Sequence, residues 1–406
     1  MDNGTCCRFP EWGREVVRTF FLPSLNLFYD YTTGDSFEHR FDHLPKPEEI
    51  AAEDPDSCGR GSGMEDCPLH AGAMLDAAIR CGESELASRV LIGLESLVMR
   101  HGRPGFVARG FSPFAGNLCY PNSSRDQFTL AVFGAWRAFC SMPSAVDRRC
   151  AAEILRNISD YCLENVTAEN DFNLGRFDGG PAMVSLMRRG CAPHEALRLP
   201  MFHAAAGVAT GESERIAVAA ALLPEAIAKT LEMRDDGGWW DISLSQFQLS
   251  VAVLLECNAF PEAAGTLREI SREICRLTRR ELEILLARGE ADPARLNARM
   301  CDWRDCPRRL LVAPAAEGGQ SYRHVTLPQE YQIAAGILRG IGNLLTTLFY
   351  GKEAPSPEAA CRIVRLLSAV DFPHCSCGGT IQLLQGVSLF PGLVPSSISN
   401  RKGGSL

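Results

Sequence analysis

Apolar residues recur at helical spacing along most of this chain. From Leu86 to Val98, apolar side chains return at three- and four-residue steps, and charged residues such as Glu85 and Arg89 lie largely on the other face. The stretch 262–288 repeats the pattern, with leucine and isoleucine on one face and arginine and glutamate on the other. Both segments are expected to form amphipathic helices with one side in water.

Other stretches are apolar on nearly every side. Residues 69–79, 197–209, 216–228 and 332–348 consist mainly of small and apolar residues. Helices of this composition are buried on most sides and need neighbours around them.

Capping residues mark several helix starts. Ser144 is followed three residues later by Asp147, Asp292 stands before Pro293, and Ser356 stands before a proline and a glutamate. Together with the periodicity, these signals predict about twelve helices: 11–22, 64–80, 84–101, 123–141, 144–163, 180–189, 194–209, 212–232, 242–257, 261–289, 328–349 and 357–369.

Few segments compete as strands. The clearest candidates are residues 25–32 and 309–314, which are too few to make a sheet domain. We therefore predict a single all-α domain over residues 1–406, with a partly irregular segment at 1–60. Because wetter helices alternate with nearly all-apolar ones, helical hairpins are expected to form an outer ring around an inner ring.

Charge and composition exclude several classes of protein. The 406 residues include 41 Lys and Arg against 49 Asp and Glu, a net charge of −8. This balance argues against a general nucleic-acid binder or an anionic-membrane binder, which needs a basic face. The apolar runs 216–224 and 249–255 are shorter than the ~18–20 residues of a membrane span. The N-terminus lacks the pattern of a secretory signal, so a cytoplasmic location is expected.

The chain has 17 cysteines, an odd number. Most stand singly in apolar helical patterns, where a free thiol behaves as a small hydrophobe, so we expect reduced cysteines. The close pairs Cys6/Cys7, Cys301/Cys306 and Cys375/Cys377 do not repeat with the spacing of a zinc finger or ribbon. Signatures of dinucleotide, Walker A and zincin sites are also incomplete, so neither a metal nor a cofactor is expected.

Four polar segments between helices could carry chemistry. They are 58–66, 105–127, 176–180 and 235–241, and each places Asp beside glycine, arginine or an aromatic residue at a helix start. Aromatic faces stack on sugar rings, Arg and Asn bind hydroxyls or carboxylates, and paired carboxylic acids supply a general acid and base. This composition favours a small carbohydrate as the substrate.

Three motifs resemble a known family. Gly61-Ser62-Gly63-Met64-Glu65-Asp66, Pro104-Gly105-Phe106-Val107-Ala108-Arg109-Gly110 and Asn122-Ser123-Ser124-Arg125-Asp126-Gln127-Phe128-Thr129 are similar to motifs of uncharacterised bacterial proteins grouped with the six-hairpin glycosidases. The resemblance is firmest over residues 58–140. It implies an (α/α)6 toroid with a carbohydrate-active site. The unsaturated glucuronyl hydrolases of that superfamily use two inner-helix aspartates, and by position the candidates here are Asp66 and Asp126.

The leading hypothesis is a glycoside hydrolase for a small glycan or a uronic-acid-containing oligosaccharide. Asp126 is the expected general acid/base and Asp66 its partner. The expected substrate-binding residues are Arg109, Tyr120, Arg125, Gln127, Asp178, Trp239 and Trp240, with Tyr120 and the two tryptophans as stacking walls. The alternatives are a non-catalytic sugar-binding or scaffold protein, and a polysaccharide lyase or sugar epimerase that uses Tyr120 as the base beside Arg125.

Overall fold

A computed structural model describes residues 9–34, 36–55, 59–187, 191–233, 240–312 and 321–393. This part of the chain is mostly helical and contains thirteen α-helices. They are α1 (Glu11–Phe20), α2 (Pro47–Ala52), α3 (Cys67–Arg80), α4 (Ser84–Met99), α5 (Arg125–Ser141), α6 (Ala145–Asn165), α7 (Arg198–Thr210), α8 (Ser213–Thr230), α9 (Asp241–Cys257), α10 (Ala264–Ala291), α11 (Gln329–Tyr350), α12 (Pro357–Ala369) and α13 (Gly379–Ser388).

Strands occur only as three antiparallel pairs in the described residues. The pairs are β1 (Phe21–Leu22) with β2 (Leu27–Phe28), β3 (Asn173–Gly175) with β4 (Pro181–Ser185), and β5 (Arg308–Val312) with β6 (Ser321–Val325). The all-α class predicted from the sequence is therefore confirmed.

Eleven of the twelve predicted helices are α-helices, with ends that differ by a few residues. Two predicted caps are present: the hydroxyl of Ser144 accepts a hydrogen bond from the Asp147 N–H at 3.2 Å, and the hydroxyl of Ser356 accepts one from the Ala359 N–H at 3.1 Å. Asp292 precedes only a short 3-10 helix, Pro293–Asn297.

The helix predicted at 180–189 is wrong. Residues Pro181–Ser185 form β4, which pairs with β3 through Asn173 opposite Ser185 and Gly175 opposite Pro181. A short apolar run fits either a helix or a buried strand, and here the partner strand decides. The strand predicted at 25–32 shrinks to Leu27–Phe28, whereas the one at 309–314 corresponds to β5.

Two helices were not predicted. Helix α2 is only six residues long, and α13 begins with glycines that give no start signal. Nine of the ten residues of α13 are buried, and it packs against α11 and α3. Helix α13 is thus stabilised by its neighbours rather than by its own sequence pattern.

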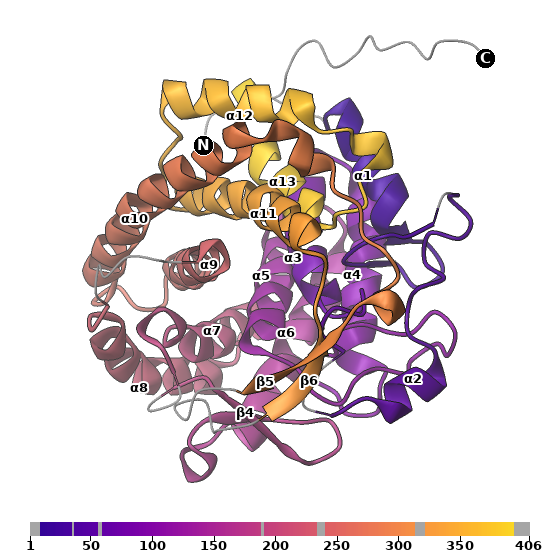
Figure 1. The fold of residues 1–406 in the computed structure, drawn as a ribbon. Coiled ribbons are helices and arrows are strands. Elements are labelled where there is room, and N and C mark those ends of the chain that lie inside the picture. Colours follow the sequence, from indigo (N-terminus) through magenta and orange to yellow (C-terminus); the bar gives the residue numbers. More distant parts are fainter. Residues whose placement is uncertain are drawn as a thin grey trace, which may run out of the picture.

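From α3 onward, every second helix along the chain contacts the next one in the series. Helix α3 packs against α5, α5 against α7, α7 against α9, α9 against α11, α11 against α13, and α13 against α3 (Figure 1). The helices between them in the chain, α4, α6, α8, α10 and α12, are far less buried: only four of the thirteen residues of α12 are buried. This alternation matches the wet and apolar helices expected from the sequence, except at 216–228. That stretch was expected to be buried on most sides, but it lies in α8, of which only five of the eighteen residues are buried.

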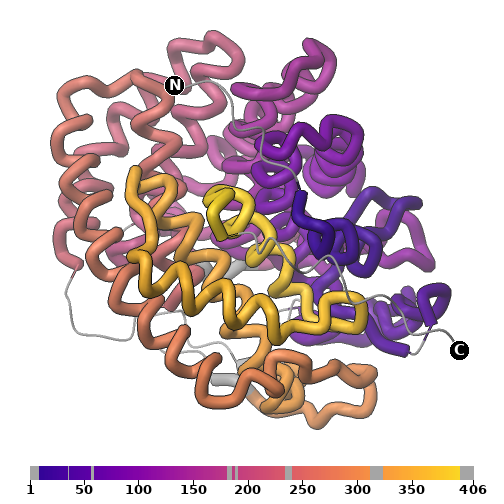
Figure 2. The backbone as a smooth tube through the Cα atoms, turned by 90° about the horizontal axis from the view of Figure 1, so that it is seen from above, coloured from indigo at the N-terminus to yellow at the C-terminus, as the bar shows by residue number. Residues whose placement is uncertain are grey.

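The start and the end of the described chain lie side by side. Helix α1 contacts α13, and the ring of Trp12 stacks on Phe372 at 4.3 Å between centroids. Figure 2 shows the same neighbourhood from above, with the indigo N-terminal segment beside the yellow C-terminal helices. Helix α1 is therefore packed against α13 and against the short 3-10 helix Phe372–His374 that precedes it.

Helix α11 is long and apolar enough to cross a membrane when judged by length and composition alone. However, 72% of its most apolar window is buried against the rest of the protein. The core helix of a soluble protein passes the same test, and α9, α10 and α13 all pack against α11. Its apolar composition is accounted for by these neighbours.

Glycines allow the closest helix approaches. A Cβ atom on Gly342 of α11 would lie 2.2 Å from the backbone of Gln382, and one on Gly386 of α13 would lie 2.4 Å from the Gly342 carbonyl oxygen. Both distances are far below any normal contact, so α11 and α13 touch through their backbones. Any side chain here would separate them.

We expect Gly342→Ala to lower the free energy of unfolding by about 1–3 kcal/mol or more, because the added methyl group must displace backbone. Gly336→Ala is the matched control on the same helix. A Cβ there would meet no atom within 4 Å, so the higher helix propensity of Ala should stabilise the protein by up to ~1 kcal/mol. Chemical denaturation measures both values, and equal stabilities would contradict the observed helix contact.

Candidate functional site

Charged and polar side chains gather where the buried helices begin. Asp66 directly precedes α3, Asp126 lies in the first turn of α5, Arg198 begins α7 and Asp241 begins α9. Helix α11 contributes Arg339 from its middle. We use the name rim cluster for the following set: Asp30, Glu65, Asp66, Arg109, Asp126, Gln127, Arg198, Asp241 and Arg339.

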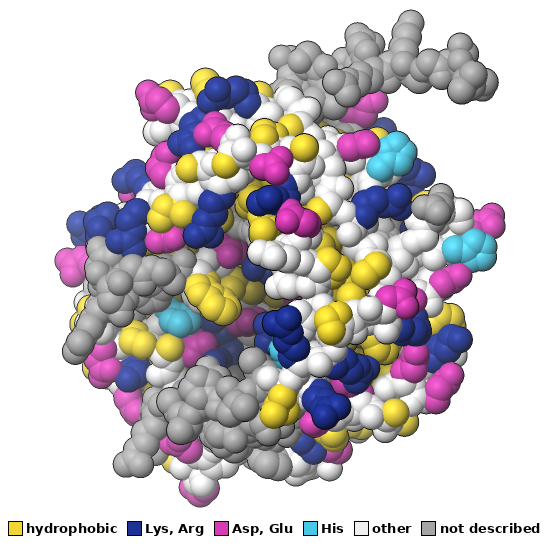
Figure 3. All heavy atoms as spheres, viewed as in Figure 1, with side chains coloured by type: hydrophobic (Ala, Val, Ile, Leu, Met, Phe, Trp, Pro, Cys, Tyr) yellow, Lys and Arg dark blue, Asp and Glu magenta, His cyan; other side chains and the backbone are white. Residues whose placement is uncertain are grey.

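The face that carries this cluster is concave. Figure 3 shows a hollow near α9 with acidic and basic side chains visible inside it. The side chain of Asp126 keeps 39% of its surface exposed although protein surrounds it closely enough for burial to act on its pKa. A side chain with both properties lines a depression rather than a flat surface.

Asp66 presents its carboxylate to the cluster. Its side chain makes no capping hydrogen bond to α3; instead, its Oδ1 accepts a 2.8 Å hydrogen bond from the Gln127 amide. The same Gln127 nitrogen donates to the Glu65 carbonyl oxygen at 3.0 Å. Gln127, a predicted substrate-binding residue, therefore joins the start of α5 to the start of α3.

Asp30 holds the Asp66 loop in place. Its two carboxylate oxygens accept hydrogen bonds from the backbone N–H groups of Glu65 at 2.9 Å and Asp66 at 3.0 Å. His70 Nε2 lies 3.1 Å from Asp30 Oδ1, and the Gln382 amide nitrogen lies 3.0 Å from His70 Nδ1. Through these contacts, the Asp30 carboxylate joins the N-terminal segment to α3, and His70 joins α3 to α13.

Two carboxyls beside Asp30 are shifted towards the protonated form. Burial raises the pKa of Asp66, and the charge of Asp30 raises it further against the opposing effect of His70. Burial also raises the pKa of Glu65, to about 8, with Asp66 and Asp30 acting in the same direction. Asp30, Glu65 and Asp66 lie close together with little access to water, and ionising all three carboxyls at once is unfavourable.

Asp126 has the opposite environment. Its Oδ1 lies 2.9 Å from Nη1 of Arg198, a guanidinium that is almost completely buried. Burial raises the pKa of Asp126, but Arg198 and Arg125 lower it more, so that it lies below its ordinary value. The Asp126 carboxylate is therefore held ionised.

Arg109 links the two aspartates electrostatically. Its guanidinium lowers the pKa values of both Asp66 and Asp126, and it donates to the Glu65 carbonyl oxygen at 3.4 Å. A charge acts on both groups only when it lies near both. The two predicted catalytic residues thus share a neighbour, at the N-terminal ends of two helices in contact.

Three other predicted site residues make contacts with their structural surroundings. Tyr120 is 1% exposed, so its ring offers no stacking face. Arg125 forms a 2.7 Å ion pair with Glu195 and donates to the Ser185 carbonyl oxygen at 3.1 Å. Asp178 forms a local ion pair with Arg176 at 2.7 Å in a turn. These contacts give Tyr120 and Asp178 structural environments, whereas Arg125 combines its ion pair with a position near enough to Asp126 to lower the pKa of that carboxyl.

Of the two tryptophans, Trp239 lies outside the described residues. Trp240 directly precedes α9 and is 71% exposed. It is the predicted stacking residue whose ring is open to solvent. It stands next to Asp241, whose Oδ2 accepts a 2.8 Å hydrogen bond from Asn343 and lies 3.4 Å from Arg339 Nε.

Sequence reasoning missed Asp30, and gave no role to Arg198 and Arg339. A signal exists for Arg339, because it is the single charged residue between Glu330 and Lys352 in an otherwise uncharged stretch. A lone charge in a buried helix requires a partner or a polar cavity. Asp30 had no such signal, since it stands in a short segment with ordinary strand composition.

A small cavity of about 10 Å³, lined by both apolar and polar side chains, adjoins Arg339 of the rim cluster. Its lining residues include Ser245, Gln246, Arg339, Asn343, Gln382 and Gln385. Gln246 is 1% exposed, and neither polar atom of its amide has a hydrogen-bond partner among the described residues. A buried amide without partners is unfavourable unless a bound polar group completes it.

A larger pocket of about 460 Å³ lies at the other end of α9, beside Asn258, Arg268 and Lys352. Its lining residues include one acid, Glu256, so it lacks the paired acids of the rim cluster. Among the described residues, no group of three or more His, Cys, Asp or Glu side chains could hold a metal ion. The rim cluster is therefore the candidate site for acid–base chemistry.

Comparison of the chain with protein-family models finds no match, and comparison with curated proteins finds no similar sequence. Function is accordingly inferred from the geometry and charge of the rim cluster.

The Glu65 carboxyl makes stability depend on pH. In the folded protein the pKa of Glu65 is about 8, whereas the ordinary pKa of a glutamate side chain is 4.5. Between these values the folded state binds more protons than the unfolded state, so the free energy of unfolding falls as pH rises. We expect Glu65→Gln to weaken this fall and to be more stable than the wild type near pH 8. The exposed Glu48→Gln is the control, and unfolding curves measured across the range test the prediction. A constant difference between Glu65→Gln and wild type at every pH would contradict it.

The amide of Gln246 is expected to reduce stability in the unliganded protein. Gln246→Leu removes two polar atoms without partners at similar side-chain volume, so the free energy of unfolding should rise by about 1 kcal/mol. Gln248 is the matched control on the same helix, because its amide bonds Ser271 at 2.9 Å. Gln248→Leu should destabilise the protein. A loss of stability in both variants, measured by chemical denaturation, would show that Gln246 has a partner.

Proposed function

We propose that the protein is a glycoside hydrolase of (α/α)6-toroid fold that acts on a small acidic glycan. The single observation that carries the proposal is the opposite environment of Asp66 and Asp126. One carboxyl is shifted towards its protonated form and the other is held ionised. Neighbouring carboxyls with separated pKa values supply the general acid and the ionised partner of glycoside cleavage.

The toroid is supported by the helix contacts. Six buried helices, α3, α5, α7, α9, α11 and α13, contact in an order that returns to α3, and the more exposed helices alternate with them. In such an arrangement, the N-terminal ends of the buried helices converge at one face. The rim cluster draws its residues from the starts of α3, α5, α7 and α9.

The environments of the two carboxyls support a role for each. Asp66 donates its proton to the leaving glycosidic oxygen, because its carboxyl retains a proton more readily than an ordinary Asp does. Asp126, kept ionised by Arg198, stabilises the developing positive charge of the sugar or accepts a proton from the attacking water. This assignment exchanges the roles expected from the sequence, where Asp126 was the acid. The reason for the exchange is that Arg198 and Arg125 lower the pKa of Asp126.

Arginines and Trp240 support an acidic sugar as the substrate. The guanidinium groups of Arg109 and Arg339 belong to the same cluster as the two aspartates, and a guanidinium binds a carboxylate in two-pronged geometry. The exposed ring of Trp240 beside Asp241 suits stacking against a sugar ring. The proposed substrate is a short oligosaccharide that contains a uronic acid.

A second reaction, elimination by a lyase, is favoured by His194. Burial lowers the pKa of this imidazole to about 4, so it is neutral, and Arg125 and Asp126 both act on it. A neutral imidazole can accept a proton from the carbon next to a uronate carboxylate, but a pKa of about 4 makes His194 a weak base at neutral pH. Tyr120, the base suggested by the sequence, is buried and has a raised pKa, which makes it unsuited to this role.

A panel of unsaturated and saturated uronic-acid oligosaccharides, with neutral glycosides for comparison, tests the proposal. We expect turnover of an acidic member, and Asp66→Asn and Asp126→Asn should each lower kcat/KM by ~100-fold or more, the usual contribution of general acid–base catalysis. Asp160→Asn is the matched control. It removes an ion pair between α6 and α8, in which Asp160 Oδ1 lies 2.6 Å from Arg215 Nη2. The Asp160 side chain is 41% exposed, close to the exposure of Asp126.

The outcomes separate the candidates. Loss of activity in Asp160→Asn comparable to Asp126→Asn would mean that ion-pair loss, not chemistry, is responsible. A new double bond in the product, seen by ultraviolet absorbance, identifies a lyase. Binding of an acidic sugar without turnover identifies a non-catalytic sugar-binding protein. If the protein shows no binding and no turnover of any carbohydrate in the panel, the assignment to carbohydrates is overturned.

A further inference from the structure

Two cysteines approach each other outside the rim cluster. The sulfur atoms of Cys301 and Cys306 lie 3.5 Å apart. Cys301 is exposed and Cys306 is partly buried. The exposed Cys140 and Cys361 are each the single cysteine of their own helix, although Cys140 lies near enough to Cys257 to raise the pKa of that thiol. All fourteen cysteines in the described residues are free thiols.

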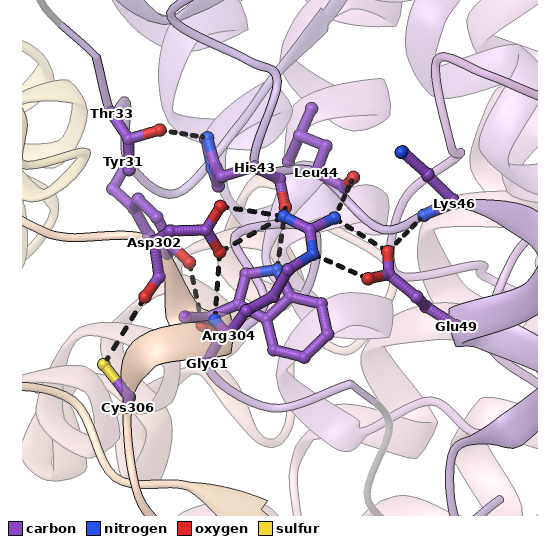
Figure 4. A network of polar contacts seen from close by, with 11 residues as sticks. Tyr31, Thr33, His43, Leu44, Lys46, Glu49, Gly61, Asp302, Arg304 and Cys306 are labelled. Atoms are coloured by element: carbon purple, nitrogen blue, oxygen red, sulfur yellow. Dashed lines mark hydrogen bonds and ion pairs between the residues drawn. The ribbon is translucent and has the colours of Figure 1, made fainter.

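The chain between the two cysteines is held in a fixed turn. Asp302 accepts hydrogen bonds from the Arg304 N–H at 2.9 Å and from its guanidinium, and Arg304 pairs with Glu49 at 2.6 Å (Figure 4). The Trp303 indole donates to the His43 carbonyl oxygen at 2.7 Å. These contacts fix the backbone from 302 to 304. Little further ordering is needed to bring the two sulfur atoms into bonding distance.

Small molecules can reach the pair. A pocket of about 480 Å³ is lined by both cysteines, with Arg309, Thr326 and Gln332 on its other sides. This volume accommodates a small organic molecule. The pair therefore combines three properties of a reactive dithiol: proximity, a fixed geometry and access.

The turn is linked to the loop that leads to Asp66 through Tyr31 and His43. The Tyr31 hydroxyl donates to the Gly61 carbonyl oxygen at 3.0 Å, and its ring stacks on His43, the residue that accepts the Trp303 hydrogen bond. A Cβ on Gly61 would lie 2.9 Å from Val325 at the end of β6. The segment that carries the cysteines is thus packed beside the Gly61–Asp66 loop.

We propose that Cys301 and Cys306 form a redox-active dithiol that converts to an intramolecular disulfide by exchange with a low-molecular-weight disulfide of the glutathione type. The proposal concerns a modification site and does not depend on the proposed glycoside hydrolysis.

The exchange proceeds in two balanced steps. The thiolate of Cys301 attacks one sulfur of the small disulfide, its sulfur–sulfur bond breaks, and the first small thiolate leaves and takes up a proton. The thiol of Cys306 then loses its proton and attacks the Cys301 sulfur, which releases the second small thiol. The two protein thiols are oxidised by two electrons, and the small disulfide is reduced to two thiols.

The environments of the two thiols agree with this order. Burial raises the pKa of Cys306 to about 12, and Cys301 raises it as well, so Cys306 begins as the protonated thiol. It also lies 3.9 Å from the Asp302 carbonyl oxygen, to which it can donate. Cys301, the more exposed of the two, is accessible to an incoming disulfide.

The test uses the full-length protein equilibrated in buffers of reduced and oxidised glutathione, then quenched in acid, alkylated and mapped by peptide mass spectrometry. We expect a Cys301–Cys306 bridge, with the loss of two hydrogens. It should form at a disulfide-to-thiol ratio at least about tenfold lower than the ratio needed to modify Cys140 or Cys361. Cys306→Ser should trap glutathione on Cys301 as a stable mixed disulfide, because the resolving thiol is absent.

Cys361→Ser is the matched control, since it removes an exposed but isolated thiol; the bridge should form in it as in the wild type. The proposal is overturned if Cys301 and Cys306 react no more readily than Cys140 and Cys361. It is also overturned if the bridge appears only after denaturation, or if Cys306→Ser retains no more glutathione on Cys301 than the wild type does.

Discussion

The carboxylate of Asp30 is the contact on which the candidate site depends. It accepts hydrogen bonds from two successive backbone N–H groups, those of Glu65 and Asp66, and it contacts His70 on α3. Its own backbone carbonyl oxygen accepts a hydrogen bond from the Gly378 N–H at 2.8 Å, just before α13. One residue of the N-terminal segment therefore fixes the loop before α3 and the start of α13. The same charge raises the pKa values of the acids that it holds in place.

Buried polar groups at the two ends of the buried helices differ in how many hydrogen-bond partners they have. Near the C-terminal end of α3, Asp76 is completely buried and accepts hydrogen bonds from Arg80 at 2.9 Å, Tyr350 at 2.7 Å and Gln385 at 3.1 Å. Both carboxylate oxygens of Asp76 therefore have hydrogen-bond partners, as is typical of a buried structural network. At the other end, Gln246 has no partner among the described residues, and neighbouring acids compete for protons. Incomplete satisfaction of buried groups is typical of a binding or catalytic site, where a ligand supplies the missing contacts.

Much of the site could be found from sequence, but its electrostatics could not. Asp66, Asp126 and Gln127 were identified because each stands at the start of an apolar helix after a polar segment, and the structure brings them to neighbouring helix ends. Tyr120 stood in the same kind of segment and is buried instead. A polar segment before an apolar helix indicates which residues lie near the helix end. It does not set which way a side chain points, because that depends on packing against elements far away in the chain.

The sequence alone determined the helical class, eleven of the helices and most of the alternation of buried and exposed ones, because these follow from periodicity within each segment. The exception is α8, whose apolar composition predicted burial although most of its residues are not buried. Only the tertiary structure decided that residues 181–185 pair as a strand, that α13 forms, and that Asp66 rather than Asp126 is the carboxyl shifted towards its protonated form. The physical reason is the same in each case. A partner strand, a neighbouring helix and a nearby charge act through space, and the distances involved are set by the fold and not by separation along the chain.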